Sequence, residues 1–162
     1  MNTKTLIKPL VFCALLSVIA CKNDTKADSK NDTLSMNDNT LLQEWTGLYE
    51  GVPAFDKMKV EDIKEAIEVG MELSLKDIDA IANNTESPTF ENTIAEMERS
   101  GEELNRVFTY YGILSSNMSS PEFREVRGEL TPKLSEYRSK ISQNENLFKR
   151  IKTVYDASQK TP

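Results

Sequence analysis

The sequence predicts an all-α fold, and three observations support that prediction. Apolar residues recur every three or four positions along four stretches between residues 60 and 157. A Ser, Thr or Asn that can cap a helix stands directly before three of those stretches. No stretch alternates apolar and polar residues over the length of a strand. We therefore expect antiparallel helical hairpins, and about 115 folded residues suffice to bury a core.

The first helix is expected over Val60–Ala82. Glu61 and Asp62 lie in its first turn, where the partial positive charge of a helix N-terminus stabilises carboxylates. The polar stretch 83–89 follows and ends the helix. Its predicted buried stripe consists of Ile63, Ile67, Gly70, Ser74, Ile78 and Ile81.

The second helix is expected as one element over Phe90–Asn117, with Thr89 as its N-cap. Its apolar residues step by four and three positions, which is typical of a helix that packs along a neighbouring helix. The predicted stripe consists of Phe90, Ile94, Met97, Gly101, Leu104, Phe108 and Tyr111.

Two glycines, Gly70 and Gly101, fall in the middle of these two stripes. A glycine inside a helix costs about 1 kcal/mol relative to alanine. Either the two glycines mark a close crossing of helix backbones, including a crossing with each other, or they are tolerated defects. The sequence leaves both interpretations open.

The third helix is expected over Pro121–Ser142, capped by Ser120 and opened by a proline at its first position. Pro132 lies inside this helix and is expected to kink it, because its ring crowds the carbonyl of Gly128. Its predicted stripe consists of Phe123, Val126, Leu130, Leu134, Tyr137 and Ile141.

The fourth helix is expected over Glu145–Ala157, capped by Asn144. Its predicted inward face consists of Leu147, Phe148, Ile151, Val154 and Tyr155.

An irregular segment over residues 41–58 precedes the first helix. It mixes glycine and proline with three large apolar residues, Trp45, Tyr49 and Phe55, which are expected to anchor it on the helices. The folded domain is therefore expected over residues 41–162.

The first 20 residues are expected to be a lipoprotein signal peptide. A short basic start is followed by an apolar run over Leu10–Ala20, which is too short to span a bilayer as a helix. The run ends in the letters VIAC, which resemble a bacterial lipobox with Cys21 as the lipid-attachment residue, although Ile19 is bulkier than usual. The alternative is an ordinary signal peptide with a chance cysteine.

Residues 21–40 are expected to form a flexible polar tether behind that anchor. This stretch is rich in Asn, Asp, Ser, Thr and Lys and has few apolar residues. Such a composition cannot bury enough surface to offset the entropy of ordering the chain.

Composition excludes several classes of function. The formal net charge is −6, and without Lys4 and Lys8 of the signal peptide 18 basic residues face 26 acidic ones, which gives −8. Such a surface repels nucleic-acid phosphates, so no nucleic-acid partner is expected. The chain has no histidine, and its two cysteines, Cys13 and Cys21, precede the folded part. Histidine-dependent acid–base chemistry and imidazole zinc sites are therefore excluded.

Neighbouring carboxylates occur on the predicted helices but lie off the apolar stripes. We interpret them as solvated helix faces and not as acid–base pairs. Accordingly, no catalytic, cofactor-binding or metal-binding residue is predicted in this chain. The pairs are Glu61/Asp62, Asp77/Asp79, Glu96/Glu98 and Glu102/Glu103.

Several runs resemble the N-terminal region of the thimet-oligopeptidase-like zinc peptidases, in particular bacterial peptidyl-dipeptidases and oligopeptidase A. The resemblance extends from residue 39 to the end. Thr40, Val60 and Glu145 stand where this family usually has proline, and each change is a modest one at a helix start. The matching runs are Asn39–Trp45, Gly51–Ile67, Asp77–Asn84, Ser87–Gly101, Leu130–Tyr137 and Asn144–Asp156.

The resemblance implies a peptidase that cleaves oligopeptides, with peptidyl-dipeptidases releasing C-terminal dipeptides. Family members hold one zinc through H-E-x-x-H and a later Glu, and the Glu of the motif activates a water. That motif lies far downstream in longer chains, and none of its residues can be assigned here. In family members the N-terminal helices form part of the lobe that walls a deep substrate channel. The resemblance therefore implies that this chain is part of a larger helical peptidase lobe.

Two hypotheses follow. In the first, the chain is the N-terminal part of a membrane-anchored zinc peptidyl-dipeptidase of the bacterial cell envelope, on the periplasmic or outer-membrane side. It is then cut short before its catalytic domain and inactive alone. In the second, it is a stand-alone helical lipoprotein that acts as a binding or scaffolding module.

Overall fold

The computed structural model describes residues 39–46 and 51–159, which are called the unit below. The predictions for the signal peptide, Cys21, most of the tether and Tyr49 lie outside the described residues. Within those residues every regular element is a helix, so the all-α prediction is confirmed. None of the described helices is long and apolar enough to cross a membrane.

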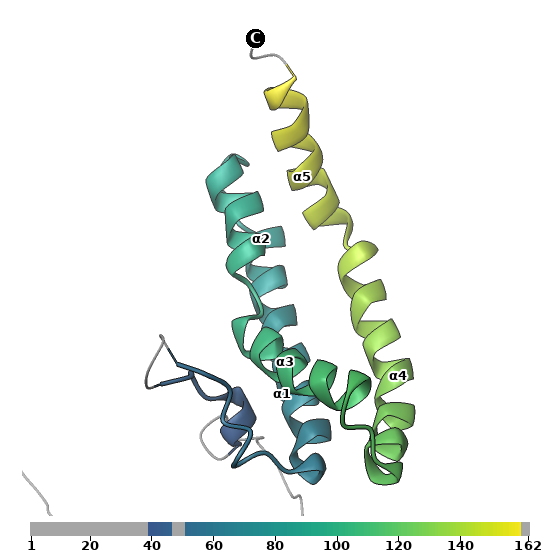
Figure 1. The fold of residues 1–162 in the computed structure, drawn as a ribbon. Helices are drawn as coiled ribbons and strands as arrows, with labels where there is room; N and C mark the ends of the chain where they lie inside the picture. Colours follow the sequence, from purple (N-terminus) through teal and green to yellow (C-terminus); the bar gives the residue numbers. More distant parts are fainter. Residues whose placement is uncertain (1–38, 47–50, 160–162) are drawn as a thin grey trace, which may run out of the picture. The chain divides into compact units, whose positions relative to one another are not determined.

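The longest helix, α1 (Val60–Ala82), lies at the centre of the unit. It contacts α3 (Glu102–Ser116) on one side and α4 (Pro121–Ser142) on another, as Figure 1 shows. The chain reverses direction after α1 and again after α3, whereas α5 (Glu145–Ser158) continues in the general direction of α4 (Figure 1). The bounds predicted for α1 and α4 are confirmed.

The core consists of two clusters along α1. The larger lies on the first half of α1 and joins it to α3, α4 and a short 3-10 helix, η1 (Thr40–Leu42). The smaller lies on the second half of α1, where Ile78, Ile81 and Ala82 meet Leu147 of α5. All six residues of the stripe predicted for α1 are buried. Because two separate clusters share one helix, α1 organises the whole unit.

Two residues that the sequence placed in the tether, Asn39 and Thr40, belong to the described helical structure. The buried side chain of Asn39 accepts a hydrogen bond from the Leu41 backbone N–H at 3.0 Å and donates to the Asp62 carbonyl at 3.1 Å. Asn39 and Thr40 therefore open the folded part, although the sequence placed them at the end of the tether. A cap residue belongs to its helix in space even when its composition matches the preceding linker.

The prediction of one continuous second helix over Phe90–Asn117 is wrong. It consists of a π-helical segment, η3 (Phe90–Ala95), a short α2 (Glu96–Arg99) and then α3. Ser100 is extended and Gly101 is left-handed, with a φ of 71°, so the helix stops and restarts. Only glycine adopts that conformation without a steric cost.

The break changes which residues of this arm are buried. Phe90, expected on the stripe, is 63% exposed. After Gly101 the buried face of α3 keeps Leu104 of the predicted stripe and adds three residues that the stripe omits, Val107, Tyr110 and Leu114.

The two stripe glycines do mark close approaches, but not with each other. A Cβ on Gly70 would lie 3.0 Å from the Cα of Leu104, so the backbones of α1 and α3 nearly touch there. A Cβ on Gly101 would lie 2.9 Å from the hydroxyl of Ser74. Gly70 therefore faces Leu104, which is one turn beyond Gly101. Gly101 in turn faces Ser74, which is one turn beyond Gly70.

Helix α4 packs on α1 through apolar residues and polar links. The caps predicted for it are confirmed, since the Ser120 hydroxyl accepts a hydrogen bond from Phe123 N–H at 3.0 Å. Pro132 lies inside α4 without ending it. Lys64 pairs with Glu129, Lys133 pairs with Glu68, and the hydroxyls of Ser74 and Tyr137 are 2.8 Å apart. These contacts fix the position of α4 along the axis of α1.

The inward face predicted for α5 is only partly correct. Asn144 caps the helix as expected, accepting a hydrogen bond from Leu147 N–H at 3.0 Å. Leu147 is buried, and Ile151 and Val154 are half-buried. Phe148 and Tyr155, however, are 63% and 61% exposed. The apolar stripe of α5 is therefore wider than the surface that covers it.

Replacing Gly70 with alanine is expected to lower the free energy of unfolding by about 1–3 kcal/mol, because the new methyl group forces the α1 and α3 backbones apart. Gly112→Ala and Gly128→Ala are the matched controls, since a Cβ at either position meets no heavy atom within 4 Å. Both controls should stabilise by about 0.5–1 kcal/mol. Urea unfolding followed by circular dichroism measures all three; equal effects at the three positions would contradict the close crossing.

The Lys64–Glu129 pair should make stability depend on pH at the acidic end. Lys64 lowers the pKa of Glu129 below its usual 4.5 by a hydrogen bond and by its charge. A carboxyl group with a lowered folded-state pKa adds stability above its unfolded pKa and loses it as the pH falls through the folded value. Glu129→Gln should therefore lower Tm slightly at pH 7, and the difference from wild type should shrink as the pH falls.

The effect should be small because both side chains are about half exposed and water screens them. The control is Glu125→Gln on the same helix, because Glu125 forms no ion pair with any described residue. A Tm difference for Glu129→Gln that is constant with pH would show that the ion pair is not its cause.

Candidate functional site

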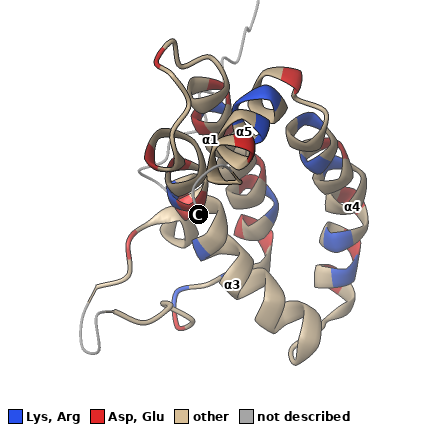
Figure 2. Cartoon of the chain, turned by 90° about the horizontal axis from the view of Figure 1, so that it is seen from above, with Lys and Arg blue, Asp and Glu red and all other residues tan. Residues whose placement is uncertain are grey.

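Reactive side chains do not gather anywhere in the described part of the chain. No group of three or more His, Cys, Asp or Glu residues there could hold a metal ion. Figure 2 shows acidic and basic residues interspersed along the helices and not collected into one patch of a single sign. A site built from charge alone is therefore not found among these residues.

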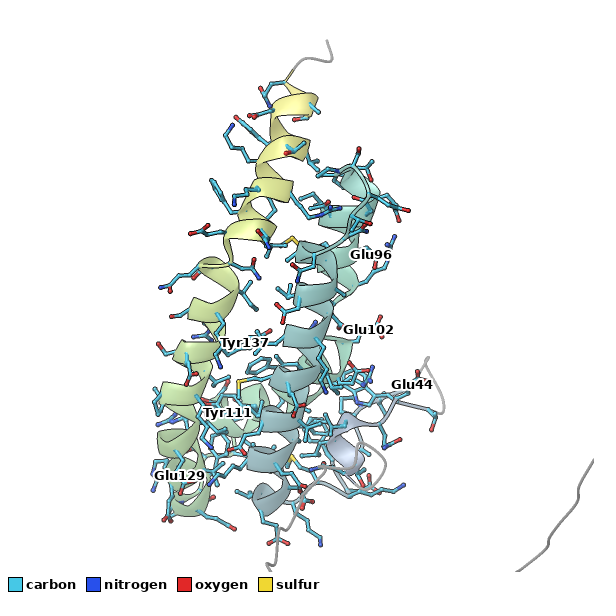
Figure 3. The ribbon with its side chains drawn as sticks, turned by 180° about the vertical axis from the view of Figure 1, so that it is seen from behind. Glu44, Glu96, Glu102, Tyr111, Glu129 and Tyr137 are labelled. Atoms are coloured by element: carbon cyan, nitrogen blue, oxygen red, sulfur yellow. The ribbon has the colours of Figure 1, made fainter. Side chains whose placement is uncertain are left out.

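The neighbouring carboxylates lie on solvated faces, as expected, since none of the eight is buried. Figure 3 shows Glu96 and Glu102 on the side of the unit away from α4 and α5. Glu96 pairs with Arg99 at 2.7 Å, and Glu102 lies 3.8 Å from Arg106. Asp77 accepts a hydrogen bond from Gly101 N–H at 3.2 Å, which supports the left-handed break. These acids serve local structure.

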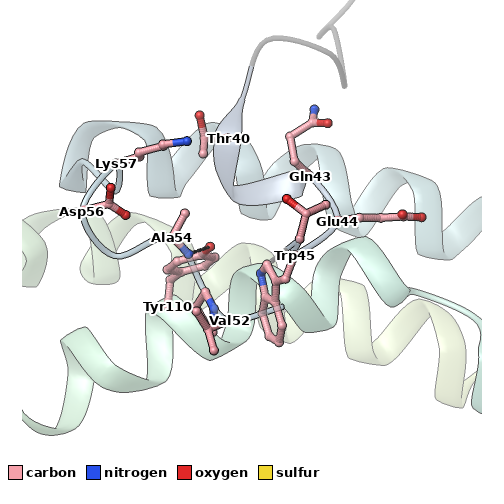
Figure 4. A pocket seen from close by; sticks show the side chains of 11 residues that line it. Thr40, Gln43, Glu44, Trp45, Val52, Ala54, Asp56, Lys57 and Tyr110 are labelled. Atoms are coloured by element: carbon pink, nitrogen blue, oxygen red, sulfur yellow. Dashed lines mark hydrogen bonds between the residues drawn. The ribbon is translucent and has the colours of Figure 1, made fainter. Parts of the chain in front are cut away.

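The clearest hollow lies where the irregular segment crosses α3. The Ala54 N–H donates to the Tyr110 hydroxyl at 2.8 Å, and the Phe55 ring packs edge-on against Tyr110 at 5.2 Å. Trp45 packs on the same ring at 6.4 Å and 86°. Trp45 and Phe55 are thus the anchors that the sequence predicted. Around them is a hollow of about 460 Å³, lined by Thr40, Gln43, Glu44, Trp45, Thr46, Val52, Pro53, Ala54, Asp56, Lys57 and Tyr110 (Figure 4).

This hollow carries no catalytic arrangement. Its lining combines one lysine with two acids and has no nucleophile beside a base. The indole nitrogen of Trp45 is buried and has no hydrogen-bond partner. The Trp45 and Tyr110 rings, drawn together in Figure 4, meet edge to face. Tyr110 therefore serves to hold the irregular segment on α3.

The most elaborate polar network surrounds Arg150 of α5, which is only 6% exposed. One guanidinium nitrogen donates to the carbonyls of Asn84 and Glu86 at 2.7 and 3.0 Å. The other donates to the side-chain oxygens of Asn92 and Thr93 at 2.9 and 3.3 Å. No carboxylate pairs with this cation among the described residues, so neutral carbonyl, amide and hydroxyl dipoles compensate its charge. We call this set the Arg150 clasp.

Asn92 connects the clasp to the start of η3. Its side-chain oxygen accepts from Thr89 N–H at 2.8 Å, and its amide donates to the Ser87 carbonyl at 3.0 Å. In return, the Thr89 hydroxyl accepts from Asn92 N–H at 3.1 Å, which completes a capping box. The clasp therefore joins α5, the loop after α1 and the first turn of η3.

Arg150 is the residue that sequence reasoning missed. It follows Lys149 and looks like half of an exposed basic pair. A signal was nevertheless present, because Arg150 lies three residues after Leu147 and four before Val154, and hence on the inward face of the helix. The partners, 57 to 66 residues away in the chain, gave no such signal.

The runs that carry the family resemblance all have structural roles here. Residues 51–57 fold over Tyr110, residues 87–93 form the capping box and half of the clasp, and Gly101 restarts the helix. Asn144 caps α5, and Arg150 closes the clasp. In the described residues these motifs specify shape and not a reaction.

Comparison with known proteins gives relatives of two kinds. No protein-family model matches the chain. A dipeptidyl carboxypeptidase of Escherichia coli is 31% identical over 103 residues, which is 64% of this chain and 15% of the relative. A dipeptidyl carboxypeptidase of Salmonella typhimurium is 28% identical over 120 residues, 74% of this chain and 18% of the relative.

Oligopeptidase A of Escherichia coli is 27% identical over 105 residues, 65% of this chain and 15% of the relative. The chain is thus related to these peptidases over part of its length, as the resemblance predicted. It spans less than one fifth of the length of these relatives.

Replacing Arg150 should reveal the energetic weight of the clasp. Arg150→Gln is expected to lower the free energy of unfolding by about 1–3 kcal/mol, because it leaves partly buried carbonyl groups and the buried Thr93 hydroxyl without their donor. Lys149→Gln on the same helix is the matched control, since the Lys149 side chain is 70% exposed, and should change stability by less than about 0.5 kcal/mol. Chemical denaturation measures both; equal small effects would show that water satisfies the carbonyls instead.

Proposed function

We propose that this chain is the channel-wall portion of a zinc peptidase that releases dipeptides from the C-termini of oligopeptides, and that it does not catalyse this reaction alone. One observation carries the proposal: the chain matches dipeptidyl carboxypeptidases and oligopeptidase A over 64 to 74% of its own length but over less than one fifth of theirs. The oligopeptide substrate and the rest of the peptidase are the partners that the proposal requires.

The residues of this chain do not fit the zinc site that such an enzyme requires. The chain has no histidine, and its described residues contain no cluster of possible metal ligands. We therefore assign no step of peptide hydrolysis to any residue here. What this chain contributes is a helical wall whose shape is specified by the α1–α3 crossing, the segment on Tyr110 and the Arg150 clasp.

The proposal includes attachment to a membrane of the bacterial envelope. Its support is the sequence: an apolar run that ends at Cys21, followed by a polar stretch that can separate a lipid anchor from the folded unit. The lipid on Cys21 would hold the peptidase outside the inner membrane, where oligopeptides are its substrates. Mass spectrometry of the native N-terminal peptide tests this part separately.

A second function is supported by a different observation. The described unit has a core of its own, in which Ile63, Val107, Tyr110, Phe123 and Leu130 are all fully buried. Such a core favours a domain that folds alone, and a stand-alone helical lipoprotein would serve as a binding or scaffolding module. A sharp, monomeric thermal transition that binds no hydrophobic dye would favour it; a broad, dye-binding transition would favour the wall of a larger enzyme.

Two measurements test the proposed function. The native polypeptide should be several times heavier than 162 residues, and its peptides should read into an H-E-x-x-H sequence. The purified 162-residue chain should release no dipeptide from a substrate with a free C-terminus. A native product that ends at Pro162, or chelator-sensitive hydrolysis by the short chain, would contradict the proposal.

A further inference from the structure

The apolar stripe of α5 is covered along one edge only. Leu147, Ile151 and Val154 face the rest of the unit, whereas Phe148 and Tyr155 are more than half exposed. These two aromatic residues are seven positions apart, which is two helical turns, so they lie on the same edge about 10 Å apart along the axis. Together they form an exposed aromatic edge, defined by Phe148 and Tyr155.

The Arg150 clasp makes this exposure a fixed property of the helix. Arg150 lies on the buried side of α5, roughly 150° around the helix from the aromatic edge. Rotating α5 to bury Phe148 and Tyr155 would withdraw the guanidinium from the carbonyls of Asn84 and Glu86. That rotation would turn the guanidinium and Leu147 toward water and leave the partly buried carbonyls without their donor. Together these losses offset what burying two partly exposed rings would gain. The aromatic edge therefore stays outward.

The size of the aromatic edge selects the kind of partner that covers it. Two aromatic side chains about 60% exposed present roughly 250 Å² to solvent, so two copies meeting there would bury about 500 Å². A stable complex of free proteins buries about 1,200 Å² or more. A segment of the same polypeptide needs no such area, because its effective concentration reaches the millimolar range. The aromatic edge is therefore suited to one further helix of the same polypeptide.

We propose that the aromatic edge of α5 is the seam on which the peptidase body packs, through the apolar stripe of an amphipathic helix about 14 residues long. This inference rests on the proposed function, because the helix comes from the remaining four fifths of a chain as long as the relatives. Phe148 and Tyr155 then join the channel wall to the part of the enzyme that performs the chemistry.

Thiol labelling compares the solvent accessibility of the aromatic edge in a longer and a shorter form of the protein. Phe148→Cys, Tyr155→Cys and the control Lys149→Cys are made in the native-length product and in the 162-residue chain. Labelling is quantified at each introduced site by peptide mass spectrometry, so other cysteines do not contribute. Labelling at 148 and 155 should be at least about ten-fold slower in the native-length product, and labelling at 149, on another face of α5, should differ by less than about two-fold.

Three results would overturn this inference. Equal labelling of 148 and 155 in both lengths would leave the proposed function standing but show that the edge is not the seam. Met118 lies after α3 and is 58% exposed, so M118E is the matched control for a charge placed on an exposed apolar residue. A dimer of the 162-residue chain that F148E and Y155E together disperse, and M118E does not, would make a second copy the occupant. A native product that ends at Pro162 would remove the occupant and, separately from the labelling, the proposed function itself.

Discussion

The close approach of α1 and α3 is the contact on which the rest of the described structure depends. Because Gly70 has no side chain, the backbone of Leu104 comes against α1, and α3 lies deep enough for Val107 and Tyr110 to be fully buried. Tyr110 in turn holds the irregular segment through its hydroxyl and its ring. One missing methyl group thus determines the depth of a helix, the position of a tyrosine and the course of a loop.

The sequence predicted correctly the features that depend on neighbouring residues, such as where a helix begins and ends. The bounds of α1 and α4 were correct because polar stretches, caps and a leading proline delimit them. The second helix was wrong because apolar spacing continues through Gly101, and periodicity does not record whether a glycine is left-handed. Phe148 and Tyr155 match the apolar pattern of α5 but not its contacts, since the rotation of that helix depends on partners about 60 residues away.

The candidate site shows the same division between local and distant information. The lack of histidine already excluded an H-E-x-x-H motif within these 162 residues. The sequence could not show that the motif residues act as caps, clasps and loop anchors, because their partners lie in other elements. Asn92 illustrates this, since one side chain joins a capping box to a buried guanidinium. In the proposed channel wall, such precision of shape would decide which substrates enter.

The Arg150 clasp also has a consequence for synthesis on the ribosome. The loop after α1 and the start of η3 are translated first, but the cation that binds their carbonyls comes 57 to 66 residues later. Until α5 has left the exit tunnel, those carbonyls and the hydroxyl of Thr93 must remain hydrated, and the second half of α1 lacks Leu147. The nascent chain therefore completes its first core cluster while the second waits for α5, so folding proceeds from one end of α1 to the other.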